Sequence, residues 1–135
     1  MGETTLVDTN VLLDVLTHDP TWFEWSAGAL ADAFDHGRVV INPLIFAEVS
    51  VGFDRLEDLE WALPSPYVER VALPWDAGFL AGKAFVAYRR RGGEKSALLP
   101  DFYIGAHAAV ADYTLLTRDR RRFTTYFPTL RIVAP

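Results

Sequence analysis

Residues 98–123 read "LLPDFYIGAHAAVADYTLLTRDRRRF" and combine a helix pattern with a strand pattern. Small and apolar residues predict a buried helix from about Asp101 to Ala111, and "TLLT", residues 114–117, has the composition of a short buried strand. Asp101 stands at the start of this helix and Asp119 directly after this strand. An acid at the end of each buried element needs an explanation, because an unpaired charge is costly to bury.

The rest of the chain continues this alternation of strands and helices. We expect strands at residues 4–8, 38–42, 68–73, 114–117 and 131–134, and helices at 10–16, 20–35, 43–53, 55–63, 75–93, 101–111 and 120–127. Gly37 is expected to close the second helix, as glycine often does. Alternating strands and helices predict an α/β fold in three layers, with a short parallel sheet between helices, as a single domain spanning residues 1–135.

The composition of the chain limits which metal ligands and which partners are possible. The chain has no cysteine, so oxygen atoms or imidazoles would have to hold any metal ion. The N-terminus lacks the basic residues of a secretory signal, and the apolar runs are too short to span a membrane, so we expect a cytoplasmic protein without a membrane partner. Residues 1–82 carry three basic and fourteen acidic residues, whereas residues 83–135 carry ten basic and four acidic ones. The C-terminal part could therefore face phosphates despite a net charge of -5.

Four acids lie where a parallel sheet would bring them together. Asp8 and Asp119 follow predicted strands, and the carboxyl ends of parallel strands meet at one edge, where ligands bind. Glu48 lies in the apolar segment "PLIFAEVSVGF", and Asp101 begins its helix. Each acid also has a simpler explanation: Asp8 and Asp101 as helix N-caps, Glu48 on an exposed stripe, and Asp119 in a surface ion pair.

Taken together, the four carboxylates favour a cation site. Clustered carboxylates repel one another unless a cation or a proton intervenes. Mg²⁺ and Mn²⁺ prefer carboxylate and water oxygens, and they assist reactions at phosphodiesters. The sequence therefore predicts a Mg²⁺ site, with Mn²⁺ as the alternative ion.

Three segments, "LVDTNVLLDVL", "INPLIFAEVS" and "PDFYIGAHAAVADYTLLTRDRRRF", resemble the PIN-domain ribonucleases, and more narrowly the VapC toxins of bacterial toxin-antitoxin pairs. The resemblance covers essentially the whole chain. It implies a metal-dependent endoribonuclease that acts on tRNA or rRNA, forms a homodimer, and is inhibited by a cognate VapB-like antitoxin. In the mechanism that we expect, a metal-activated hydroxide attacks the phosphorus in line and leaves a 5′-phosphate and a 3′-hydroxyl.

Carried over by position, the family's acidic quartet falls on Asp8, Glu48, Asp101 and Asp119, which are the expected catalytic residues and metal ligands. The residues expected to support the metal-bound waters or to contact RNA are Thr9, Asn10, Thr117 and Arg118. Further arginines near Asp119, and Arg89, Arg90, Arg91 and Lys95 before Asp101, could hold RNA phosphates or simply be solvated.

Other residues and functions stay open at this point. We expect Asp14 and Asp112 at the surface and His107 packed in its helix, while Trp22, Trp25, Trp61 and Trp75 could belong to the core or to a partner surface. A non-catalytic module that binds a protein partner or RNA is an alternative function. A haloacid-dehalogenase-type phosphatase is less favoured, because it needs a second Asp where this chain has Asn10.

Overall fold

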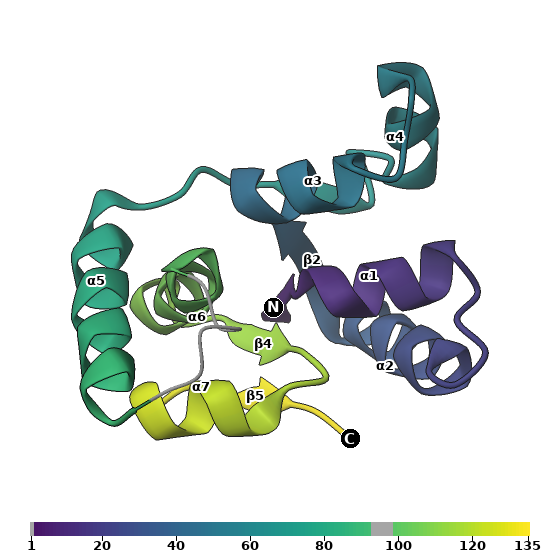
Figure 1. The fold of residues 1–135 in the computed structure, drawn as a ribbon. Coiled ribbons are helices and arrows are strands. Elements are labelled where there is room, and N and C mark those ends of the chain that lie inside the picture. Colours follow the sequence, from purple (N-terminus) through teal and green to yellow (C-terminus); the bar gives the residue numbers. More distant parts are fainter. Residues whose placement is uncertain (1, 93–98) are drawn as a thin grey trace.

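The computed structural model describes residues 2–92 and 99–135 (Figure 1). Its strands are β1 (Glu3–Val7), β2 (Gly37–Ile41), β3 (Val68–Arg70), β4 (Thr114–Leu116) and β5 (Ile132–Val133). Its helices are α1 (Thr9–Leu16), α2 (Phe23–His36), α3 (Pro43–Ser50), α4 (Leu56–Ala62), α5 (Trp75–Arg90), α6 (Leu99–Ala111) and α7 (Arg120–Tyr126). Every strand and helix expected from the sequence is present, with boundaries that differ by a few residues.

The strands form one parallel sheet in the order β3-β2-β1-β4-β5. The chain builds outward from β1 through β2 to β3, then crosses back to β4 on the other side of β1. Because parallel crossovers are right-handed, this reversal puts the helices on both faces. Figure 1 shows α1 and α2 on one side of the sheet and α5 and α6 on the other. The predicted three-layer α/β/α architecture is confirmed, and the strand order reverses between β1 and β4.

The core lies between the central strands and the helices that cover them. Leu6 of β1, Val40 of β2 and Leu115 of β4 are fully buried, as parallel strands covered on both faces should be. The middle of helix α6 is buried, at Phe102 and from Ile104 to Ala108, as its small and apolar residues predict. Among the helices of residues 2–92 and 99–135, none combines the length and hydropathy needed to cross a bilayer.

Two predicted helix boundaries differ from the structure for local reasons. Helix α2 begins at Phe23 instead of Pro20, because the carboxylate of Asp19 accepts the backbone N–H groups of Thr21 and Trp22 and holds a turn there. Gly37 ends α2 without the left-handed turn typical of such glycines, since its backbone is extended and it is already the first residue of β2. Helix α5 ends at Arg90, before the predicted end at residue 93, which itself lies outside the described residues.

Gly105 of α6 allows the closest helix packing in the core. A Cβ atom at this position would lie 2.6 Å from Cε2 of Phe127 and 2.7 Å from Cδ1 of Phe123. Phe123 and Phe127 are themselves buried, so neither ring has room to retreat freely. The missing side chain is therefore what allows α6 to pack against α7 and the residue that follows it.

Gly105→Ala should lower the free energy of unfolding by about 1 to 2 kcal/mol, because overpacking outweighs the gain in helix propensity. Gly82→Ala in α5 is the matched control, since nothing lies within 4 Å of a Cβ atom there. It should raise the free energy of unfolding by about 0.5 to 1 kcal/mol. Urea unfolding of both variants measures the difference, and equal effects would contradict the tight packing.

Candidate active site at the carboxyl edge of the sheet

Asp8 lies where β1 ends and α1 begins. Its backbone N–H donates to the carbonyl oxygen of Leu116 on β4 at 2.8 Å, and its Oδ1 accepts the backbone N–H of Thr9 at 2.8 Å. The side chain therefore caps α1, as one of the two explanations from the sequence proposed. Capping does not exclude a catalytic role, because the same residue stands at the reversal in strand order where α/β sheets bind ligands.

Hydrogen bonds from Thr117 and Asn10 tie the ends of β1 and β4 together around Asp8. The Thr117 hydroxyl donates to Oδ2 of Asp8 at 2.7 Å and accepts the backbone N–H of Asp119 at 3.1 Å. The Asn10 amide donates to the same Oδ2 at 3.4 Å, and its oxygen accepts the backbone N–H of Arg118 at 3.3 Å. The loop that carries Asp119 is thereby held beside Asp8.

Glu48 reaches this edge from α3. Its Oε1 accepts the hydroxyl of Thr9 at 2.6 Å, so Thr9 contacts Asp8 through its backbone and Glu48 through its side chain. Glu48 is exposed, which agrees with the stripe explanation, and its hydrogen bond gives it a fixed direction. The structure therefore places Glu48 next to the residues around Asp8.

Asp101 and Asp119 share one arginine. Asp101 lies within the first turn of α6, which begins at Leu99, so the simpler explanation of Asp101 as the N-cap is wrong. Asp119 is the N-cap of α7 and accepts the backbone N–H of Arg122 at 3.3 Å. The guanidinium of Arg122 lies 3.5 Å from Oδ2 of Asp101 and 3.3 Å from Oδ2 of Asp119.

Burial is the main cause of an altered acidity at Asp8. The side chain is buried, and this burial raises the pKa of Asp8 from an ordinary 3.8 to about 6. Hydrogen bonds from Thr117 and Thr9 lower the pKa, whereas the negative charges of Asp101 and Glu48 raise it further. The influence of both acids shows that they lie close enough to interact electrostatically with Asp8.

The four carboxylates lie at one edge of the sheet without forming a preformed metal site. Within residues 2–92 and 99–135, no three His, Asp or Glu side chains are close enough together to hold a metal ion as they stand. The donor set nevertheless fits a hard divalent cation, because it is all oxygen, it carries excess negative charge around Asp8, and a cationic side chain already lies between two members. The ligands would have to move to coordinate one ion together.

The structure corrects the expectation for Asp14. Asp14 is only 3% exposed, accepts the hydroxyl of Ser26 at 2.6 Å, and lies 2.9 Å from Nε of Arg118. That Nε is not aligned for a hydrogen bond with any acceptor, so the contact is an ion pair. The Arg118 guanidinium also lies 5.1 Å from the ring of Trp22. Asp14 is therefore buried, and its contacts with Ser26 and Arg118 connect α1 to α2 and to the loop after β4; we call this group of contacts the buried clasp.

The contacts of Arg118 with Asp14 and Trp22 affect the RNA-binding role that the sequence predicts for it. Its guanidinium faces Asp14 and Trp22, so contact with RNA would require it to leave an ion pair. The sequence did contain a sign of the burial of Asp14, because it follows buried Val11 by three residues on the same helix face. Arg122, which sequence reasoning did not single out, likewise stands three residues after Asp119, at the spacing of helical ion pairs.

The remaining singled-out residues divide clearly. His107 is buried and its Nδ1 lies 3.1 Å from the Asn42 amide, so it is packed as expected, and burial lowers its pKa. Asp112 pairs at the surface with Arg131, as expected. The four tryptophans split into two half-buried residues, Trp22 and Trp25, and two exposed ones, Trp61 and Trp75. Lys95 lies outside the described residues.

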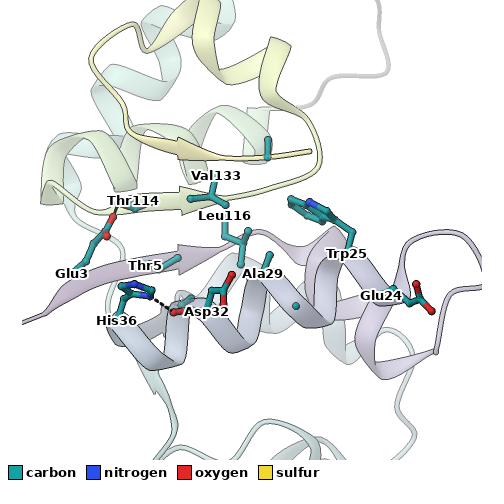
Figure 2. Close-up of a pocket in the computed structure, with 13 residues that line it drawn as sticks. Glu3, Thr5, Glu24, Trp25, Ala29, Asp32, His36, Thr114, Leu116 and Val133 are labelled. Carbon is teal, nitrogen blue, oxygen red and sulfur yellow. Dashed lines mark hydrogen bonds between the residues drawn. The ribbon is translucent and has the colours of Figure 1, made fainter.

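A hollow of about 540 Å³ lies elsewhere, between α2 and the face of β1, β4 and β5 (Figure 2). Trp25, Ala29 and Asp32 of α2 line one wall, and Leu116 and Val133 line the other. None of the four acids lines it. The candidate site is therefore defined by the hydrogen bonds and charges at the sheet edge and not by the volume of this hollow.

The fold agrees with a comparison against known families. The model of the PIN domain matches residues 5–126. This chain belongs to the PIN domain family. The match begins inside β1 and ends at the last residue of α7, so it includes all four acids of this PIN domain and Arg122.

Solved structures share the fold of this PIN domain over nearly its whole length. VapBC2 from Rickettsia felis, bound to a DNA fragment from their promoter, has a TM-score of 0.75 at 18% identity, with 98% of each chain covered. FitAcB from Neisseria gonorrhoeae has a TM-score of 0.72 at 20% identity, with 97% of each chain covered. A toxin-antitoxin complex from Klebsiella pneumoniae has a TM-score of 0.66 at 20% identity, also with 97% covered. Among curated proteins, none matches the sequence.

Proposed function

We propose that this PIN domain is an endoribonuclease that depends on Mg²⁺ or Mn²⁺ and acts as the toxin of a toxin-antitoxin pair. The observation that carries the proposal is Asp8, a buried carboxylate at the reversal in strand order, whose pKa is raised by burial and by two neighbouring acids. Buried, charged groups that a fold maintains at a ligand-binding edge are typical of functional sites.

The proposed ligands are the four acids Asp8, Glu48, Asp101 and Asp119. A bound Mg²⁺ or Mn²⁺ ion would lower the pKa of a water molecule and neutralise the charge that develops on the phosphate. Thr117 and Asn10 hold the carboxylate of Asp8 in place, and Thr9 directs Glu48. Such supporting hydrogen bonds fix the orientation of ligands before an ion arrives.

The proposed substrate and partners follow from the resemblance of the sequence to the VapC toxins. We propose tRNA or rRNA as substrate, a VapB-like antitoxin as inhibitor, and a homodimer as the assembled form. The similarity in fold to VapBC2, to FitAcB and to a toxin-antitoxin complex supports the antitoxin proposal. Ten basic residues after position 82 provide positive charge for an RNA backbone.

The test is cleavage of a panel of single-stranded and structured RNAs by the purified chain, with Mg²⁺ or Mn²⁺ and with EDTA. We expect metal-dependent cleavage that leaves 5′-phosphate ends, detected by sequencing the ends. The variant Asp8→Asn should lose this cleavage. Asp112→Asn is its matched control, because Asp112 is an exposed acid outside the candidate site. Cleavage that survives EDTA would contradict the metal dependence, and no cleavage across the panel would favour a non-catalytic binding module.

A further inference from the structure

Arg122 connects two of the proposed metal ligands from different parts of the fold. Asp101 belongs to α6 and Asp119 caps α7, and the Arg122 guanidinium lies within 3.5 Å of a carboxylate oxygen of each. The Arg122 side chain is 28% exposed, whereas the neighbouring Arg120 and Arg121 are exposed to solvent. Of the three consecutive arginines, Arg122 is the one turned toward the acids.

The position of Arg122 matters because the carboxyl edge of the sheet carries several negative charges. Four acids lie at this edge, and the charges of Asp101 and Glu48 already act on Asp8. Arg118, the other half-buried arginine near the site, is paired with Asp14. Among residues 2–92 and 99–135, Arg122 is therefore a cation placed to offset acidic repulsion at both Asp101 and Asp119.

A divalent ion and this guanidinium compete for the same carboxylate oxygens, Oδ2 of Asp101 and Oδ2 of Asp119. Two positive centres a few ångströms apart repel, and a carboxylate oxygen that faces an arginine is not free to coordinate a metal ion. The guanidinium between Asp101 and Asp119 also agrees with the lack of a preformed metal group among the described side chains.

We propose that Arg122 is a built-in counter-ion that competes with the divalent metal ion for Asp101 and Asp119, so that metal binding requires its side chain to move away. This inference rests on the proposed metal-dependent function. Arg122 acts through the two carboxylates, and it is therefore a residue that sets metal affinity.

Direct Mn²⁺ binding to the purified full chain tests the inference without measuring cleavage. Isothermal titration calorimetry compares the wild type with Arg122→Gln, with Arg122→Lys, and with Arg121→Gln as the matched control. Arg121→Gln removes the same charge from an exposed position on the same helix. We expect Arg122→Gln to bind Mn²⁺ about tenfold more tightly, because a nearby positive charge is removed, and Arg121→Gln to change the affinity less than about threefold.

Thermal unfolding in EDTA supplies a second readout. Without metal, Arg122→Gln should melt at a lower temperature than the wild type, and saturating Mn²⁺ should raise its melting temperature by more than that of the wild type. Arg122→Lys keeps the charge and should bind Mn²⁺ within about threefold of the wild type. Arg122→Met is a second neutral variant that should bind Mn²⁺ more tightly in the same way, and it keeps the comparison intact if Arg122→Gln does not fold.

The outcomes separate this inference from the proposed function. Equal Mn²⁺ affinity in Arg122→Gln and Arg121→Gln, together with metal-dependent cleavage, would overturn the competition and leave the nuclease proposal standing. Weaker Mn²⁺ binding in Arg122→Gln would show that Arg122 supports the site, which also overturns the competition. If neither the wild type nor any variant binds Mn²⁺, the metal site itself is wrong and both proposals fail.

Discussion

Asp8→Asn should abolish RNA cleavage and at the same time stabilise the metal-free protein at pH 8. The loss of cleavage should exceed about 100-fold, because even residues that only support a metal ligand cost 10 to 100-fold when they are replaced. The gain in stability has a separate cause. The substitution removes a negative charge that the wild-type fold buries beside Asp101 and Glu48. A functional site that is strained in this way reduces the stability of the fold that carries it.

The sign of the stability effect follows from the pKa values. The pKa of Asp8 is about 6 in the folded chain, against 3.8 for an ordinary aspartate. Between these two values the folded state binds more protons than the unfolded state, so stability falls as the pH rises through this window. Above pH 6 the full penalty is present, at most about 3 kcal/mol.

The Asn side chain carries no charge, but it fits the three donors around Asp8 less well than a carboxylate does. We therefore expect a net gain of about 1 to 2 kcal/mol at pH 8 in EDTA, which disappears below pH 4. Urea unfolding at both pH values, with Asp112→Asn as control, measures it. A variant no more stable than the wild type at pH 8 would show that Asp8 is not a buried charge in the metal-free protein.

Asp14→Ala should destabilise the fold by about 3 kcal/mol and lower the melting temperature by about 10 °C. The substitution leaves the half-buried Arg118 guanidinium without its carboxylate and the buried Ser26 hydroxyl without its acceptor. The expected value lies at the low end for a broken buried ion pair, because Arg118 is 30% exposed and water can solvate part of it.

Calorimetry on Asp14→Ala, Arg118→Ala and the double variant separates the pair from its surroundings. The coupling between the two residues should be about 1 kcal/mol or more, because they are in direct contact. Glu57→Ala is the control, since its pair with Arg55 is exposed and its loss should cost less than about 1 kcal/mol. Similar losses in Asp14→Ala and Glu57→Ala would contradict the buried clasp.

Much of the fold was predictable from residues that are close in the sequence. The apolar runs that end at Asp8 and before Asp119, and the helices between them, predicted a parallel sheet, and the structure has one. Because parallel strands end at a common edge, the sequence order also predicted that Asp8 and Asp119 would approach each other. Thr117 and Asn10 now provide the hydrogen bonds that connect them.

The pairing of charges was not predictable in the same way. Asp14 was expected at the surface, yet it is buried against Arg118, which is 104 positions later in the chain. From the sequence, Arg122 was one of several arginines that could hold RNA phosphates or be solvated, yet it alone of the three arginines at positions 120–122 lies between Asp101 and Asp119. Period and propensity depend on neighbours in the sequence, so they are visible in the order of residues. An ion pair depends on which faces of distant helices meet, and only the packing of α1, α6 and α7 around the sheet decides that.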